Sequence, residues 1–244
     1  MKEKRLTALI TGANKGIGFS VAEELLRLGY YVYLGARDKV KGQAAINTLK
    51  AKGFSKVSLL SIDVADPVSV WKAAAWLAGK EDHLDVLVNN AAIGGRRPQK
   101  ASSGDVAILK EVFDTNFFGA IEVTRAFLLL MRRSEAPRIV NVSSELSSLW
   151  FQERDTSSFY ATELMAYSAS KTALNSFTLM LAKELQHTEF KVNSVTPGFT
   201  ATDLTDHSGH QTPEEAARIV VKFATLSQEG PSGQFFGSKG RIPW

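Results

Sequence analysis

Short apolar segments alternate with longer segments of helical periodicity along the whole chain of 244 residues. Bounded by Gly, Asp or Asn, the short segments read as strands. They cover residues 6–11, 31–36, 57–62, 86–89, 139–142, 192–196 and 234–236. Several are apolar on both faces, which is typical of a parallel sheet covered by helices on both sides. We therefore predict an α/β fold: one doubly wound domain spanning residues 1–244, with a seven-stranded parallel sheet.

Composition excludes several classes of protein. There are no cysteines, so neither disulfides nor thiolate chemistry is possible, and redox chemistry would need a bound cofactor. The net charge of +4 is spread along the chain without a polybasic tract, so we expect no nucleic-acid partner. The longest aliphatic run, 126–131, is far below the ~20 apolar residues that cross a bilayer. We expect no membrane contact, no metal and, because the first apolar run is too short for a signal peptide, a cytoplasmic location.

A glycine-rich turn joins the first predicted strand to the first predicted helix. Its sequence is Thr-Gly-Ala-Asn-Lys-Gly-Ile-Gly at 11–18. Unpaired N–H groups and the positive end of the helix dipole attract a phosphate at such a position, and glycines let the backbone approach closely. The spacing departs from the usual G-x-G-x-x-G, but the strand-turn-helix context is the same. The turn predicts a Rossmann-type dinucleotide site, the alternative being an ordinary tight turn.

The end of the second predicted strand indicates which dinucleotide binds. An acid usually stands there against the ribose hydroxyls, but this chain has Ala36 followed by Arg37. A guanidinium can hold a 2′-phosphate by charge-assisted hydrogen bonds, and Lys15 in the glycine turn can add a second positive charge. We therefore expect NADP(H). Asp38 would argue for NAD if its carboxylate turned toward a ribose, but it can also cap the next helix.

Polar side chains after two of the later strands and on two predicted helices form a candidate catalytic group. Tyr167 and Lys171 are four residues apart, which on a helix is one face, one turn apart. Ser143 and Ser144 end a strand, and ligands gather at the carboxyl ends of strands in open parallel sheets. Asn-Asn-Ala-Ala at 89–92 ends the preceding strand, and Asn116 follows in the next helix.

With these motifs the chain resembles the short-chain dehydrogenase/reductase family over essentially its whole length. The matching positions are the turn at 11–18, Asp63-Val64, Asn-Asn-Ala at 89–91, Asn116, Ser144, Tyr167, Lys171 and the segment from Pro197-Gly198 to Thr202. The glycine turn, Asn-Phe-Phe-Gly at 116–119 and the late Gly-Pro-Ser-Gly-Gln-Phe are most similar to carbonyl reductases.

The resemblance implies NADPH-dependent reduction of ketones or aldehydes to alcohols. Tyr167 would give a proton to the carbonyl oxygen, and Ser144 would hold that oxygen by a hydrogen bond. A phenol has an ordinary pKa near 10, and a cation at Lys171 would lower it by up to about three units. Asn116 would hold a water that connects Lys171 to solvent. The alternatives are a reductase of 3-oxoacyl thioesters, a steroid-type alcohol dehydrogenase, or an NADP-sensing regulator without catalysis.

The resemblance also implies the remaining site residues. Those expected to contact the cofactor are Gly12, Asn14, Lys15, Gly16, Ile17, Gly18, Arg37, Asp63, Val64, Asn89, Ala91, Tyr167, Lys171, Pro197, Gly198, Thr200 and Thr202. Those expected to contact a small-molecule carbonyl substrate are Ser144, Trp150, Tyr160 and Tyr167. We interpret Arg96 and Arg97 as a solvated loop rather than a substrate clamp.

Two departures from the family pattern stand out. Ala92 occupies a position that is usually glycine, which is tolerated where φ is negative. An extra segment, 145–163, lies between Ser144 and Tyr167 and is rich in aromatic and aliphatic side chains. Beside the active site it either covers surface left bare elsewhere or forms an apolar wall or lid that selects bulky ketones or aldehydes. Because related insertions cover the helix face used by tetrameric relatives, it also favours a monomer over a homo-oligomer.

Overall fold

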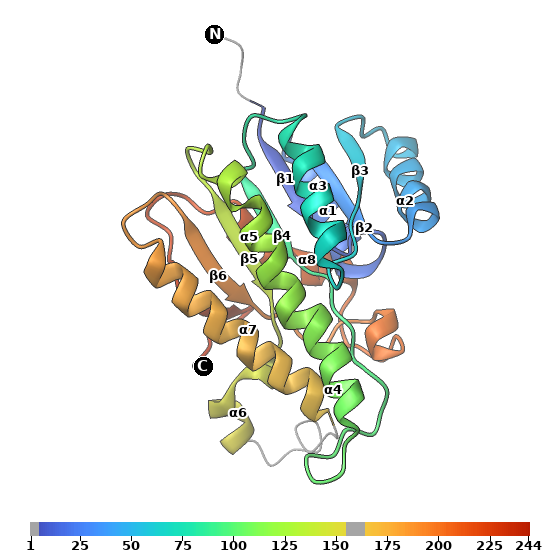
Figure 1. The fold of residues 1–244 in the computed structure, drawn as a ribbon, viewed down its shortest axis with the longest axis vertical. Coiled ribbons are helices and arrows are strands. Elements are labelled where there is room, and N and C mark those ends of the chain that lie inside the picture. The colour runs from blue at the N-terminus through green and yellow to red at the C-terminus, as the bar shows by residue number, and fades with distance from the viewer. Residues whose placement is uncertain (1–4, 155–163) are drawn as a thin grey trace.

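The computed structural model describes residues 5–154 and 164–244. Its centre is one sheet with strands in the order β3-β2-β1-β4-β5-β6-β7-β8 (Figure 1). The strands are β1 Thr7–Ile10, β2 Tyr31–Ala36, β3 Val57–Ser61, β4 Val86–Asn89, β5 Arg138–Val142, β6 Lys191–Val195, β7 Phe235–Gly237 and β8 Gly240–Arg241. The first seven pair in parallel, which confirms the predicted α/β class.

The eighth strand corrects the predicted seven-stranded sheet. β8 is a two-residue strand that pairs antiparallel with β7 through Phe236 and Arg241. Such a short segment carries no alternation of apolar and polar residues, so the sequence pattern gave no sign of it.

Helices cover both faces of the sheet. They are α1 Gly16–Arg27, α2 Lys39–Ala51, α3 Pro67–Ala78, α4 Val106–Phe113, α5 Gly119–Met131, α6 Leu149–Arg154, α7 Met165–Glu184 and α8 Pro213–Ala224. The side chains of β1 alternate between two cores. Ala8 and Ile10 pack with residues of α1, α2 and α8, whereas Leu9 packs with residues of α3, α5 and α7. This arrangement is the doubly wound one predicted from strands that are apolar on both faces.

Two helix starts show how local sequence defines the elements. Thr212 caps α8 with a reciprocal pair of hydrogen bonds to Glu215, and Pro213 follows at the first helical position, as predicted. Asp38 accepts hydrogen bonds from the N–H groups of Val40 and Lys41 at the start of α2. Asp38 is therefore a helix cap, which resolves the alternative that it turns toward a ribose.

A turn of π-helix, Asp114–Phe118, interrupts the segment between α4 and α5. π-Turns within helices are rare and frequently mark functional sites. Asn116, its buried central residue, is held here with 1% of its surface exposed.

Of the extra segment at 145–163, the described part, 145–154, is largely helical, and 155–163 lie outside the described residues. It begins with a 3-10 turn, Glu145–Ser147, and continues into α6. The end of the chain packs against it: Ser148 Oγ donates a hydrogen bond to the Pro243 carbonyl at 2.7 Å, and the Trp244 carbonyl accepts the Trp150 N–H. The Trp244 ring also stacks on Phe235, with ring centroids 5.9 Å apart.

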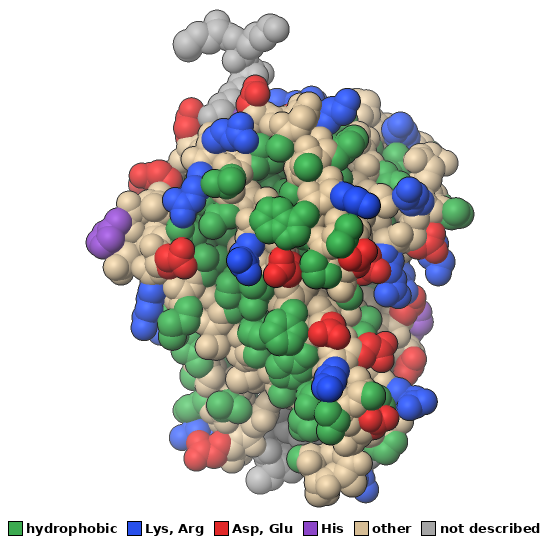
Figure 2. Space-filling model, viewed as in Figure 1, with side chains coloured by type: hydrophobic (Ala, Val, Ile, Leu, Met, Phe, Trp, Pro, Cys, Tyr) green, Lys and Arg blue, Asp and Glu red, His purple; other side chains and the backbone are tan. Residues whose placement is uncertain are grey.

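The surface of the helical layer on the α3 and α5 side mixes charges of both signs (Figure 2). Apolar side chains lie between them, and the exposed large ones on these elements include Trp71, Trp76 and Leu129. Within the described part of the chain, no helix combines the length and apolar character needed to cross a membrane.

Candidate active site

One cavity of about 830 Å³ lies along the carboxyl ends of the strands. The glycine turn, the segments after β3, β4 and β5, the start of α7 and the loop after β6 all line it. Among the residues expected to bind a cofactor, every one except Asn89 lines this cavity. The cavity therefore joins the predicted phosphate site to the predicted catalytic residues.

Backbone geometry makes the glycine turn suitable for a phosphate. Gly12 and Gly16 have φ values of +63° and +56°, a backbone conformation that residues with a side chain rarely adopt. A Cβ at Gly18 would lie 2.5 Å from Asn90 Nδ2 and 2.8 Å from the Gly12 carbonyl oxygen. Lys15, the residue before α1, makes no side-chain cap to that helix. The first N–H groups of α1 therefore face the cavity without a side-chain cap, as a bound pyrophosphate requires.

Positive charge stands at this end of the cavity as predicted. Arg37 is exposed at the rim, and among the described residues it forms no hydrogen bond or ion pair. Lys15 forms an ion pair with Asp203, across the cavity from the glycine turn. Lys15 shares its charge with Asp203, whereas Arg37 has no such partner among the described residues.

Asn89, the last residue of β4, and Asn90, which follows it, differ from expectation in which of them faces the cavity. Asn89, predicted to contact the cofactor, is 4% exposed. Its Nδ2 donates hydrogen bonds to Thr124 Oγ1 on α5 and to Asn141 Oδ1 on β5. Asn90 lines the cavity instead and donates to the carbonyls of Thr11 and Gly12, bracing the glycine turn. Successive side chains of a strand point to opposite faces, so only one of two adjacent asparagines can face the site. Ala92 has a negative φ and also lines the cavity, so its methyl group is tolerated.

Tyr167, Ser144 and Lys171 meet at the middle of the cavity. The phenol of Tyr167 hydrogen-bonds to Ser144, which selects Ser144 over Ser143 as expected. Ser143, by contrast, is buried and bonds to Ser147 Oγ. Lys171 Nζ lies 5.8 Å from the centre of the Tyr167 ring and donates to the Val142 carbonyl at 2.8 Å. Helix α7 thus presents both residues on one face, as the spacing of four predicts.

Burial controls the protonation of this group. It raises the pKa of Tyr167 to about 12, although the hydrogen bond with Ser144 acts in the opposite direction. It lowers the pKa of Lys171 to about 7. The direction for Tyr167 is opposite to the lowering expected from a neighbouring cation. The physical reason is that burial disfavours both charged forms, and a lysine that is largely neutral has little charge to stabilise a phenolate.

Asn116 has a different set of partners from the one expected. Its Oδ1 accepts the Ile93 N–H at 2.8 Å, and its Nδ2 donates to the Ile93 carbonyl and to Ser170 Oγ. Ser170 Oγ in turn donates to the Tyr167 carbonyl at 2.7 Å. The side chain of Asn116 thus connects the segment after β4 to α7. Its part in holding a water stays a prediction.

The other end of the cavity is mainly apolar. The apolar side chains that line it include Ile93, Leu146, Leu164, Phe199 and Leu204. Trp150, expected to contact a substrate, is 41% exposed on α6 and is not among the lining residues. Tyr160, the other aromatic residue expected there, lies outside the described residues.

Four titratable side chains line the cavity although the sequence did not indicate them: Arg97, Glu145, Asp203 and His207. Arg97, interpreted as a solvated loop residue, is exposed but stands at the rim. His207 lines the opposite rim, where it contacts Asp203 at 3.0 Å. His207 and Asp206 are the described non-glycine residues with positive φ, at 57° and 49°. Strained backbone of this kind is frequent at functional sites.

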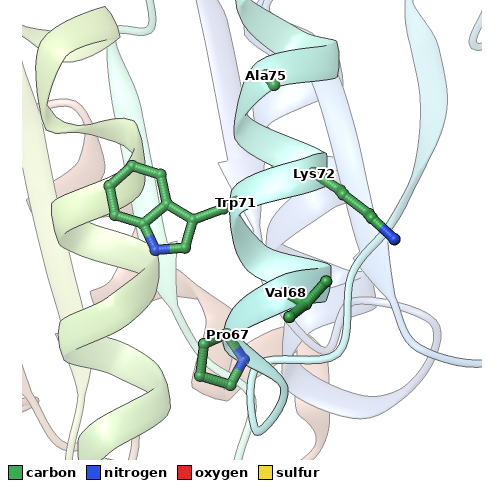
Figure 3. A pocket seen from close by; sticks show the side chains of 5 residues that line it. All are labelled: Pro67, Val68, Trp71, Lys72 and Ala75. Carbon is green, nitrogen blue, oxygen red and sulfur yellow. The ribbon is translucent and has the colours of Figure 1, made fainter.

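A second, shallow hollow lies on the outer surface of α3. It is lined by Pro67, Val68, Trp71, Lys72 and Ala75, and Trp71 points toward the neighbouring α5 (Figure 3). All five residues come from the first turns of one helix, and Lys72 is the only titratable group among them. This hollow offers no arrangement for catalysis.

Comparison with known proteins agrees with this geometry. A model of the short chain dehydrogenase family matches residues 6–213. The (+)-neomenthol dehydrogenase of Arabidopsis thaliana is 35% identical, over 95% of this chain and 96% of that protein. Carbonyl reductase [NADPH] 1 of Mus musculus is 31% identical over the full length of both chains. The structure of NADPH-bound carbonyl reductase from chicken fatty liver superposes with a TM-score of 0.84 at 26% identity, covering 99% and 100% of the two chains. The chain therefore belongs to the short-chain dehydrogenase family, in a branch similar to the carbonyl reductases.

Proposed function

We propose that this protein reduces ketones or aldehydes to alcohols with NADPH. The observation that carries the proposal is the hydrogen bond between the Tyr167 phenol and Ser144, beside Lys171, at the middle of a cavity whose one end is a glycine-rich phosphate turn. The similarity to a carbonyl reductase that binds NADPH supports the choice of cofactor. Arg37 supports it independently, because an exposed guanidinium at the rim suits a 2′-phosphate.

The chain's own residues account for the proton and for the position of the substrate. When bound, the nicotinamide supplies the hydride. Tyr167 has a pKa of about 12, so it holds its proton at neutral pH and can donate it to the oxygen of the reduced carbonyl. Ser144 donates a hydrogen bond to the same oxygen and keeps it beside the phenol. Lys171 has a pKa of about 7 and can return a proton to Tyr167 after each turnover.

The apolar end of the cavity favours a compact, largely apolar carbonyl compound. Aliphatic and aromatic side chains line this end, and Ser144 and Lys171 are the polar groups beside the phenol that would anchor a carbonyl oxygen. Apolar lining with a few polar anchors is the usual composition of small-molecule sites. We therefore expect a cyclic or aromatic ketone to be reduced better than a polar thioester.

The decisive measurement is the loss of NADPH absorbance with a panel of carbonyl compounds. The panel contains cyclic terpenoid ketones, aromatic aldehydes, steroid ketones and a 3-oxoacyl thioester, so that each alternative enzyme class is represented. We expect the highest kcat/KM among cyclic ketones or aromatic aldehydes. Highest values on thioesters or steroids would replace the proposed substrate class. NADPH binding without turnover of any compound would indicate a nucleotide sensor.

Tyr167→Phe is the matched control for the panel. It removes only the phenolic oxygen, and loss of a general acid costs roughly 10²–10⁴-fold in rate. We expect kcat to fall by about 10³-fold while NADPH binding changes little. Unchanged turnover in this variant would exclude Tyr167 as the proton donor.

A further inference from the structure

The catalytic helix α7 begins without a local cap. Leu164, the residue before it, makes no side-chain hydrogen bond to the helix, although the first N–H groups of any helix lack partners within the helix. Tyr167 is the third residue of α7 and lies in this first turn. The position of the phenol therefore depends on what holds these N–H groups.

Gln99, which is distant in the sequence, accepts hydrogen bonds from the N–H groups of the first three residues of α7. Its main-chain carbonyl accepts the Met165 N–H at 3.2 Å. Its Oε1 accepts the N–H groups of Ala166 and Tyr167 at 3.0 and 3.3 Å. Gln99 is 3% exposed, so water cannot replace these bonds without local opening.

The other end of the same side chain fixes the segment that follows β4. Gln99 Nε2 donates to the carbonyls of Gly94 and Arg96 at 2.8 and 3.3 Å. Gly94 lines the cavity beside the apolar substrate end. Because both N–H donors and the oxygen of the amide are used, replacing the side chain would leave several buried groups without partners.

Asn116 ties the same segment to α7 at a second point. It holds the main chain of Ile93 and reaches Ser170, whose hydroxyl bonds to the Tyr167 carbonyl. The N–H and the carbonyl of Tyr167 are thus connected, through Gln99 and through Asn116 and Ser170, to the two ends of segment 93–99. The protein uses two buried amides to hold one residue.

We infer that Gln99 is a positioning residue that sets the place of the Tyr167 phenol relative to Ser144 and the cavity. The inference rests on the proposed function for its catalytic consequence, but not for its geometry. A displacement of about 1 Å in a reacting group can cost 10²-fold in rate. Gln99 therefore acts on catalysis through the main chain of α7, without touching the substrate.

Two substitutions separate the functions of the amide. Gln99→Met keeps the length of the side chain but removes its donors and its acceptor. Gln99→Glu keeps an acceptor toward the first turn of α7, where a negative charge is favourable, and removes the two donors to the Gly94 and Arg96 carbonyls. Asn193→Leu is the control for lost stability, since Asn193 is a buried amide that bonds to Pro231 and Gln234 and does not line the cavity.

For Gln99→Met we expect kcat to fall by 10- to 100-fold, consistent with displacement of the phenol by about 1 Å, with the dissociation constant of NADPH changed less than about threefold. Gln99→Glu should recover at least half of that loss on a logarithmic scale. Asn193→Leu, compared at the same temperature interval below its Tm, should keep its kcat within about twofold of the wild type. A kcat for Gln99→Met within twofold of the wild type would overturn the inference, as would equal losses in Gln99→Met and Asn193→Leu.

The ionisation of Tyr167 gives a second readout that needs no turnover. With tyrosine labelled at the ring carbon that bears the hydroxyl, and Tyr167→Phe used for assignment, the signal of Tyr167 is followed by NMR as the pH rises. We expect Tyr167 to titrate closer to pH 10 in Gln99→Met, because water reaches a phenol that is no longer held in place. An unchanged titration would overturn the inference even if the wild-type protein reduced no carbonyl compound, and a shift would support it in the same case.

Discussion

Buried polar groups lie at both ends of the parallel sheet, but their partners differ. At the amino end, Asp85 accepts hydrogen bonds from the Thr7 N–H and hydroxyl and from the Ser134 hydroxyl. Arg138, 3% exposed, donates there to main-chain carbonyls, including those of Leu226 and Glu189 at 2.8 and 3.0 Å. At the carboxyl end, Tyr167 and Lys171 have few protein partners and face a cavity of about 830 Å³.

This difference separates stability from chemistry within one sheet. Groups whose hydrogen bonds are completed by the protein contribute to folding and have little left to offer a ligand. Groups that burial holds in their neutral forms beside a cavity can exchange protons with a ligand instead. Substitutions at the amino end should therefore lower the free energy of unfolding, and those among the cavity residues at the carboxyl end should change catalysis, cofactor binding or the pH dependence of stability.

The largest effect should come from Asp85→Ala at the amino end. It removes the acceptor of three hydrogen bonds and leaves the buried Thr7 N–H without its side-chain partner, so we expect the free energy of unfolding to fall by roughly 3 kcal/mol. Urea denaturation measures this loss, and kcat at a temperature where the variant is folded should equal that of the wild type. Asp82→Ala, an exposed neighbour, should stay within about 0.5 kcal/mol. A loss of kcat in folded Asp85→Ala would remove the distinction between the two ends.

At the carboxyl end, Lys171 should make stability depend on pH. Burial lowers its pKa from 10.5 to about 7, so between these values the unfolded chain binds more protons than the folded one. The stability of the wild type should therefore rise with pH across this range, by about 1.4 kcal/mol per unit, relative to Lys171→Met. From pH 7.5 to 9.5 the gain should be roughly 2.7 kcal/mol in urea denaturation.

Lys183→Met is the matched control, because Lys183 is exposed on the same helix. Its difference from the wild type should not change with pH over the same range. Parallel stability curves for the wild type and Lys171→Met would mean that Lys171 keeps its charge when folded, and that burial does not control this group.

Cofactor selectivity should depend on Arg37. Loss of an exposed charge-assisted contact in Arg37→Ala should weaken NADPH binding by about tenfold, or about 1.4 kcal/mol, with little change for NADH. Fluorescence titration with each nucleotide measures both constants. Lys39→Ala, two residues on and outside the cavity lining, is the control. Equal weakening of NADPH and NADH in Arg37→Ala would contradict the assignment of Arg37 to the 2′-phosphate.

The smallest effect should come from Asp38→Ala. Loss of this helix cap should reduce the free energy of unfolding by about 1 kcal/mol. Because Asp38 caps α2, the ratio of NADPH to NADH affinity should stay as in the wild type. A selective loss of NADH binding would show that Asp38 reaches a ribose and that this acid belongs to the site.

Local signals in the sequence predicted most of the fold and the cofactor end of the site. Seven strands, the cap of α8 by Thr212, and the positive-φ glycines of the turn at 11–18 all follow from residues close together in the chain. The relation of Tyr167 to Lys171 follows equally from helical spacing. These features depend on the backbone, which the local sequence specifies.

The bracing of the site could not be predicted in the same way. Gln99 meets α7 across 67 positions of sequence, and no periodicity marks it. Asn89 and Asn90 have the same side chain. Which of the two faces the cavity depends on the register of β4, and a shift of one residue would exchange them. The pKa of Tyr167 depends on burial by segments that are distant from one another in the sequence. Long-range contacts of this kind become visible only when the fold is known.

The docking of Pro243 and Trp244 against the start of α6 has a practical consequence for protein production. These two residues hold Ser148 and Trp150, only a few positions after Ser144. An affinity tag or fluorescent protein joined directly to Trp244 would press on the segment that leads from the active-site serine into α6. A fusion partner placed ahead of β1 starts at the opposite end of the sheet from the cavity, and so leaves both the cleft and its support intact (Figure 1).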